Sequence, residues 1–107
     1  MESRPLINRI LVESRSQARM LLRRVPASIS EPVRRAHAGA LAEFKILVGR
    51  DGTVLEITPA PDRERLPEEL LRPLVNAVRD WRYRPTLLNG NPVEVCTTVE
   101  IEIQQAS

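Results

Sequence analysis

The sequence is poor in aromatic residues and has a single cysteine. Aromatic residues make up 3% of the 107 residues, so the core has to be aliphatic, with Phe44, Trp81 and Tyr83 as its aromatic members. So few rings leave little for stacking on bases, which argues against a nucleic-acid binder. Cys96 has no second cysteine to form an intramolecular disulfide and is no zinc site by itself.

Long apolar runs and catalytic motifs are missing as well. No stretch approaches the roughly 18 apolar residues of a transmembrane helix, and no signal-peptide pattern appears. His37 is the single histidine and has no Cys or Ser partner that would suggest a triad. Glu68 and Glu69 are adjacent, so they favour a helix N-terminus rather than an acid–base pair. Since phosphate loops and metal-ligand spacings are also missing, we predict no enzyme, no cofactor and no metal.

The charge is distributed unevenly. Residues 1–35 hold eight arginines and three acidic residues, whereas residues 36–107 hold eight basic and eleven acidic residues. Lys45 is the one lysine. The basic segment fits a solvated helix face, and a nucleic-acid or anionic-membrane surface is the alternative.

Apolar residues recur near helical spacing at the N-terminal end, and we predict an amphipathic helix over residues 4–24. Ser3 is its cap and Pro5 lies in its first turn. The apolar positions are Ile7, Ile10, Leu11, Ala18, Leu21, Leu22 and Val25, with Arg4, Arg9, Arg15, Arg19 and Arg23 between them. Because Pro26 stops this helix, we divide the chain into a basic segment, 1–25, and a domain, 26–107.

A short helix and a β-hairpin are predicted next. The helix spans residues 31–38, with Ser28 and Glu31 as a capping box or Ser30 as the cap. Strands follow at residues 41–48 and 53–58. The intervening Gly49-Arg50-Asp51-Gly52 is a turn in which two glycines allow positive φ.

The last third of the domain reads as a loop, a helix and a strand. We place the regular helix at 71–82, after a turn at 67–70, because Pro73 would clash with the carbonyl of Glu69 in a running helix. Its apolar stripe ends at Trp81, which we interpret as core rather than as a ligand platform. Arg82 and Arg84 flank Tyr83 and are able to bind a carboxylate or phosphate.

Strict alternation of apolar and polar residues marks the final strand, residues 93–103. Valines and isoleucines at odd positions predict one buried face, and Cys96 falls on the polar face as a small packed thiol. The predicted fold is therefore α+β: a three-stranded antiparallel sheet with helices on one face, in the order α-β-β-α-β, preceded by an extra N-terminal helix.

Three motifs resemble the C-terminal domain family of TonB energy transducers. They are Gly49-Arg50-Asp51-Gly52-Thr53-Val54, Ala77-Val78-Arg79-Asp80-Trp81-Arg82-Tyr83-Arg84-Pro85 and Asn89-Gly90-Asn91-Pro92-Val93. They occur in the family's order between about residues 29 and 103. The motif residues that we single out as structural are Asp51, Gly52, Trp81, Arg82, Tyr83, Pro85, Asn89 and Gly90. Residues 1–25 match nothing in that pattern.

The resemblance implies a periplasmic domain at the end of a rod, in a longer protein anchored in the inner membrane. Such a domain binds the TonB box of an outer-membrane transporter and transmits force from an ion-driven motor of the ExbB and ExbD type. The alternative is a TonB-like interaction or sensor domain of another envelope protein.

An edge strand offers unpaired backbone groups to an extended peptide. We therefore predict partner binding along the edge of Val93, Glu94, Val95, Cys96, Thr97, Thr98, Val99, Glu100 and Ile101. The alternative is a central strand without a free edge. A free edge also favours homodimers.

Overall fold

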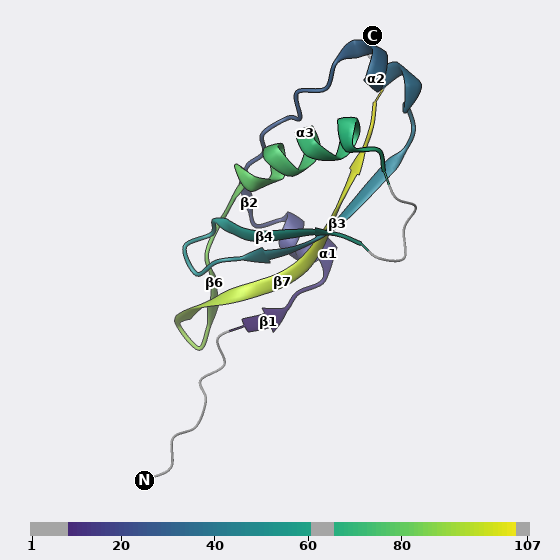
Figure 1. Cartoon of the computed structure of the whole chain (residues 1–107). Coiled ribbons are helices and arrows are strands. Elements are labelled where there is room, and N and C mark those ends of the chain that lie inside the picture. The colour runs from purple at the N-terminus through teal and green to yellow at the C-terminus, as the bar shows by residue number, and fades with distance from the viewer. Residues whose placement is uncertain (1–8, 61–65, 105–107) are drawn as a thin grey trace.

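The computed structural model describes residues 9–60 and 66–104, in which a long helix lies across a twisted sheet (Figure 1). In chain order the elements are β1 (Arg9–Leu11), α1 (Ser14–Ala18), β2 (Leu21–Arg23), α2 (Glu31–Ala36), β3 (Leu41–Val48), β4 (Val54–Pro59), α3 (Glu68–Arg79), β5 (Arg82–Tyr83), β6 (Thr86–Leu88) and β7 (Asn91–Glu102). Among these residues, no helix combines the length and the apolar character needed to cross a bilayer.

The predicted three-stranded antiparallel sheet is present, with β3 between β4 and β7. Phe44 pairs with Val99, and Ile46 pairs with both Thr97 and Ile57, so these side chains share one face. The sheet is larger than predicted because β1 adds to β7 in parallel and β6 adds to it antiparallel. A separate two-stranded sheet joins β2 to β5.

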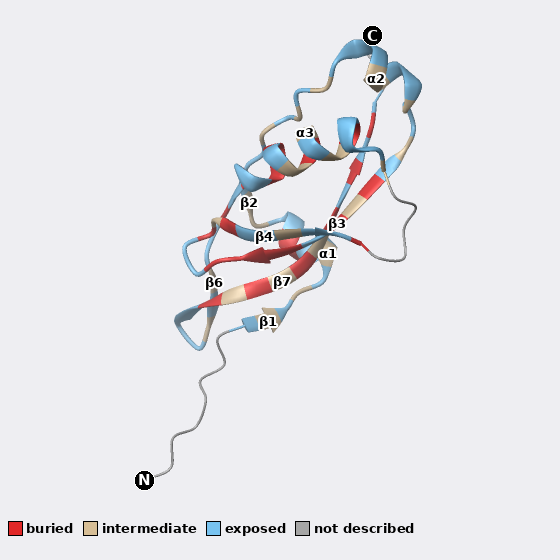
Figure 2. Cartoon of the chain, in the orientation of Figure 1, coloured by how far each residue is buried: buried red, intermediate tan, exposed pale blue. Residues whose placement is uncertain are grey.

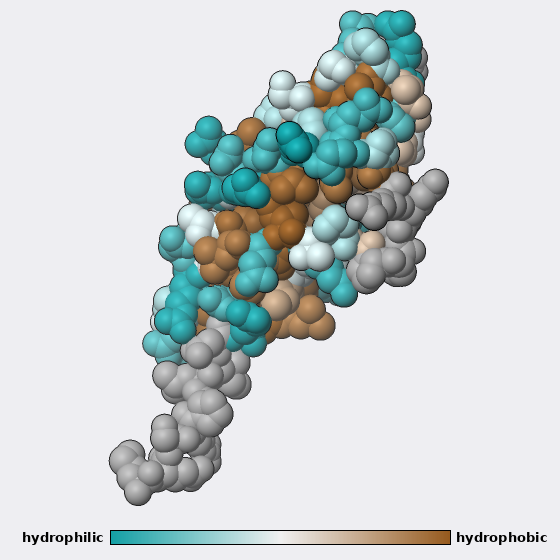
Figure 3. Space-filling view, viewed as in Figure 1, coloured by the Kyte–Doolittle hydropathy of each residue, from teal (hydrophilic) through white to brown (hydrophobic). Residues whose placement is uncertain are grey.

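The core lies between α3 and the sheet, where the buried residues gather (Figure 2). Leu70, Leu74 and Val78 form one stripe on α3, each at most 1% exposed, and face the side of the sheet that carries Phe44. Figure 3 shows hydrophobic atoms gathered between the helix and the strands, with hydrophilic atoms around them. Each fully buried leucine stabilises the fold by about 1.5–3 kcal/mol, so this stripe holds the helix on the sheet.

The predicted start of α3 is wrong. The helix runs from Glu68 to Arg79 and contains Pro73, whereas the sequence placed its regular part at 71–82. The amides of Leu70 and Leu71 both donate to the carbonyl oxygen of Pro67, so the first turn is helical. Proline removes one hydrogen bond in the helix. Leu70 is completely buried, and its packing outweighs that loss.

The predicted N-terminal helix is also wrong within the described residues. Positions 9–24 form β1, the five-residue helix α1 and β2 instead of one helix; residues 4–8, with Ser3 and Pro5, lie outside the described part. Backbone groups of this segment pair with β7 and β5 instead. Tertiary pairing therefore overrides a helical pattern that lacks apolar residues between Val12 and Gln17.

Short-range predictions fare better. α2 begins at Glu31 as expected, with Ser30 rather than Ser28 as the N-cap and without a side-chain capping bond, and it ends at Ala36. Asn89 and Gly90 both have positive φ, 54° and 82°. Positive φ at both central residues is the signature of a tight hairpin turn, and this turn joins β6 to β7.

Candidate functional site

The alternating pattern of β7 is confirmed. Val95 is fully buried and Val93 and Thr97 are each 3% exposed, whereas Glu100 and Glu102 are exposed. The buried face lies under α3, and the opposite face carries Glu94, Cys96 and Thr98, which are half-buried. The strand therefore lies in the sheet with one packed face and one more polar face.

The two edges of β7 differ. β3 pairs with β7 from Val95 to Glu102. On the other edge β1 pairs in parallel with Glu94, Val95 and Cys96, and the amide of Val12 donates to the carbonyl oxygen of Cys96 at 2.9 Å. Hence the predicted free edge is wrong at Glu94–Cys96, and Val93, the first residue predicted for it, pairs with Thr86 of β6. At Thr97–Ile101 it stays a prediction, since β3 is the one described strand that pairs with these residues.

Few contacts hold β1 in place. The Arg9 guanidinium donates from Nε and Nη2 to Glu94 Oε1 at 3.1 and 3.0 Å. This hydrogen bond and the charge of Glu94 raise the pKa of Arg9. The Arg9 side chain is 55% exposed, and exposed ion pairs contribute about 0–1 kcal/mol. Leu11 is 85% exposed, whereas Ile10 is partly buried against the core, so β1 is a short strand with one of its three side chains packed.

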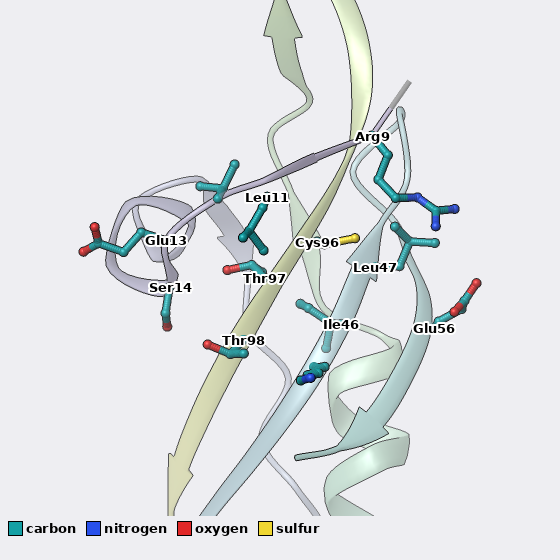
Figure 4. Close-up of a pocket in the computed structure, with 12 residues that line it drawn as sticks. Arg9, Leu11, Glu13, Ser14, Ile46, Leu47, Glu56, Cys96, Thr97 and Thr98 are labelled. Carbon is teal, nitrogen blue, oxygen red and sulfur yellow. The ribbon is translucent and has the colours of Figure 1, made fainter. Parts of the chain in front are cut away.

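A groove of about 620 Å³ lies where β1 and α1 meet β7, β3 and β4 (Figure 4). In the close-up, Arg9, Leu47, Glu56 and Cys96 lie on one side of the β7 ribbon. Glu13, Ser14 and Thr97 lie on the other side. Apolar groups and charged groups of both signs line this groove, so it is suited to a peptide with mixed side chains rather than to a single charged ligand.

Two buried polar side chains adjoin this edge without a hydrogen-bond partner. Gln17 of α1 is 1% exposed and Thr97 of β7 is 3% exposed, and the amide atoms of Gln17 and the hydroxyl of Thr97 have no partner in the described chain. An unsatisfied buried polar group costs about 1–3 kcal/mol. The contact between α1 and β7 is thus polar and imperfectly satisfied.

Trp81 and Tyr83 are structural. Trp81 is 4% exposed, its Nε1 donates to the carbonyl oxygen of Val25 at 2.9 Å, and the Arg24 guanidinium lies 5.3 Å from its ring centroid. Burial raises the pKa of Tyr83 to about 12. The prediction that Trp81 belongs to the core is confirmed, and its indole fastens residues 20–25 to the end of α3.

The predicted turn before β4 packs against β5. Asp51 Oδ1 accepts hydrogen bonds from the amide and hydroxyl of Thr53 at 3.1 and 2.7 Å, which lower the pKa of Asp51. The amide of Tyr83 donates to the carbonyl oxygen of Gly52 at 2.9 Å. Asp51, Gly52 and Tyr83 therefore act together in holding the hairpin, whereas Pro85 separates β5 from β6.

His37 lies at the surface of the domain. It is the C-cap of α2, and its Nε2 is 3.8 Å from Glu69 Oε1 in the first turn of α3. Within residues 9–60 and 66–104, no group of three or more His, Cys, Asp or Glu side chains is arranged to hold a metal ion.

β1 and its groove were missed by the sequence reasoning. A signal was present: Ile10, Leu11 and Val12 are three consecutive apolar residues, two of them β-branched, which suits a strand better than one face of a helix. The pairing itself was not visible, because its partner lies 85 residues away.

A scan of protein-family models and a search of curated proteins give no match. Among solved structures, the solution structure of the Pseudomonas aeruginosa TonB C-terminal domain is similar, with a TM-score of 0.63 and 16% sequence identity. The match covers 81% of this chain and 86% of that one. The chain therefore shares its overall α+β fold with a TonB C-terminal domain.

Proposed function

We propose that this chain is a TonB-like energy-transducer domain that binds an extended segment of an outer-membrane transporter at the outer edge of β7. The observation that carries the proposal is the β1–β7 pairing. This edge already accepts a parallel strand at Glu94–Cys96, and β7 continues for six residues, to Glu102, beyond it. The proposal gives the chain a binding role and no catalytic step.

Backbone pairing accounts for the expected affinity. Each added hydrogen bond contributes about 0.5–1.5 kcal/mol net. Several such bonds, less the cost of ordering the peptide, correspond to a dissociation constant of about micromolar. Because the backbone supplies most of the attraction, peptides of different sequence are able to bind.

The incoming segment has two ways to use the edge. It either follows β1 along Thr97–Glu102, or it displaces β1 and pairs with the whole of Glu94–Glu102. The second route is favoured by the few side-chain contacts of β1, which are one exposed ion pair and the partly buried Ile10, with Leu11 largely exposed. The groove beside β1 would then receive alternate side chains of the peptide.

In the wider proposal, the domain belongs to a longer protein anchored in the inner membrane and works in the periplasm. A motor of the ExbB and ExbD type would pull on the chain, and the transporter segment on β7 would receive that force. The fold shared with the Pseudomonas TonB domain and the three motifs around Gly52, Trp81 and Gly90 support this assignment.

The test is a titration of the labelled full chain with a peptide copied from the TonB box of a transporter, followed through backbone amide shifts. We expect shifts along Thr97–Glu102, and also at Arg9–Val12 if β1 is displaced. A scrambled peptide of the same composition is the control for non-specific contact. Shifts that avoid β7 altogether would contradict the proposed mode of binding.

A further inference from the structure

Five arginines lie in or close to the two strands of the small β2–β5 sheet. Arg23 is the register partner of Arg82. The amide of Arg84 donates to the carbonyl oxygen of Met20 at 2.7 Å, and Arg19 precedes Met20 in the sequence. Arg24 follows β2 directly. We call Arg19, Arg23, Arg24, Arg82 and Arg84 the arginine ribbon; all five are exposed.

The fold itself does not explain this arrangement. Like charges at directly opposite strand positions are destabilising, yet Arg23 faces Arg82 across the two strands. Arg24 stacks on Trp81, and Arg82 donates to the carbonyl oxygens of Arg79 and Trp81. The charge of Arg82 also acts on the Asp51 carboxyl and lowers its pKa, after the larger effect of the Thr53 hydrogen bonds.

The remaining three arginines make no ion pair within the described residues: Arg19, Arg23 and Arg84. The ribbon therefore carries an excess of positive charge on a surface that is otherwise part of an acidic domain. A complementary anion outside the chain would offset the repulsion between Arg23 and Arg82.

The shape and composition of the ribbon favour a flat partner. Its arginines line neither the groove beside β7 nor the smaller one between residues 25–28 and α3. Leu22 directly precedes Arg23 on β2 and is 61% exposed, and Leu87 on β6, three residues beyond Arg84, is equally exposed. Guanidinium groups bind phosphate through two parallel hydrogen bonds, and apolar side chains among them suit the boundary between headgroups and acyl chains.

We propose that the arginine ribbon binds the surface of a bilayer that carries anionic phospholipid headgroups. Lipid phosphates neutralise Arg23, Arg82 and Arg84 together, and Leu22 enters the headgroup layer. This inference is independent of the β7 edge, since none of the ribbon residues belongs to β7 or β1.

The test is co-sedimentation of the full chain with vesicles of phosphatidylglycerol and phosphatidylcholine, compared with vesicles of phosphatidylcholine alone. We expect binding to the anionic vesicles that weakens as salt rises. The double variant Arg23→Gln, Arg84→Gln should bind about fivefold more weakly for each arginine removed. Its melting temperature should stay equal or rise, because a cross-strand repulsion is removed.

The matched control is Arg34→Gln, Arg35→Gln on α2, which lies near the N-terminal end of α3, whereas the ribbon follows its C-terminal end (Figure 1). This control changes the net charge equally and should keep binding. Equal weakening by both pairs, or no binding to anionic vesicles, overturns the proposal. The proposal is also overturned if the ribbon arginines are needed to bind an acidic peptide or nucleic acid while the chain does not bind the vesicles.

Discussion

At the scale of single residues, Gly52 is where the β3–β4 turn closely approaches β5. Its φ is +89°, and a Cβ built there would overlap the carbonyl oxygen of Tyr83. Gly90 has a similar φ of +82° but open space around it. Alanine at Gly52 would therefore meet both backbone strain and a steric clash, whereas alanine at Gly90 would meet backbone strain alone.

We expect Gly52→Ala to lower the free energy of unfolding by more than about 2 kcal/mol, because both strain and the loss of the Tyr83 contact act on it. Gly90→Ala, with strain alone, should cost about 1 kcal/mol. Urea unfolding measures both. Equal losses at the two positions would show that the approach to β5 is unimportant.

Thr97 offers the opposite case, a substitution that should stabilise. Its hydroxyl is buried without a partner, and valine has nearly the same shape. Thr97→Val is expected to raise the free energy of unfolding by about 1 kcal/mol, whereas Thr98→Val on the other face should change it little. Thermal unfolding of the two variants checks this, and a destabilised Thr97→Val would mean that the hydroxyl is satisfied in solution.

Tyr83 makes stability depend on pH in the alkaline range. Its pKa is raised to about 12 by burial, against about 10 in the unfolded chain. The unfolded state therefore loses the proton first, so this contribution to stability is complete below pH 10 and is lost as pH rises through 12. Tyr83→Phe should show a shallower decline of unfolding free energy between pH 10 and 12; an unchanged slope would contradict the assignment.

At the scale of elements, β1 is the part that most affects the proposed binding. Val12→Pro removes the hydrogen bond to Cys96 and should loosen β1, so a TonB-box peptide should bind more tightly to β7, by about threefold to tenfold. Leu11→Pro is the control, because backbone groups alternate in direction and the Leu11 amide points away from β7. Isothermal titration with all three chains measures the effect, and equal affinities would mean that β1 does not compete.

Some of these elements could be predicted from the sequence, and others could not. β7, the β3–β4 hairpin and the Asn89-Gly90 turn were predictable, since each follows from alternation or from residues that allow positive φ. The start of α3 was not, because the burial of Leu70 outweighs the local effect of Pro73. β5 and β6 have two and three residues, too few for a periodic pattern. Whether the edge of β7 is free depends on β1. Residues 9–11 form a strand because they pair with β7, which is distant in the sequence.

At the scale of the whole molecule, β1 also affects association between copies. An unpaired strand edge is a template for another chain, and β1 covers three residues of the β7 edge. We expect the Val12→Pro variant to form dimers at lower concentration than the unchanged chain, measured by analytical ultracentrifugation. Identical sedimentation of the two would indicate that copies do not meet at this edge.

The position of β1 next to the last strand has a consequence for the order in which the chain folds. Arg9 and its partner Glu94 are separated by 85 residues, so during synthesis the first strand leaves the ribosome long before its partner exists. Contacts of such long sequence separation are slow to form. We therefore expect β1 to dock after the hairpin and α3 have assembled. It should be the last strand to join the sheet during folding.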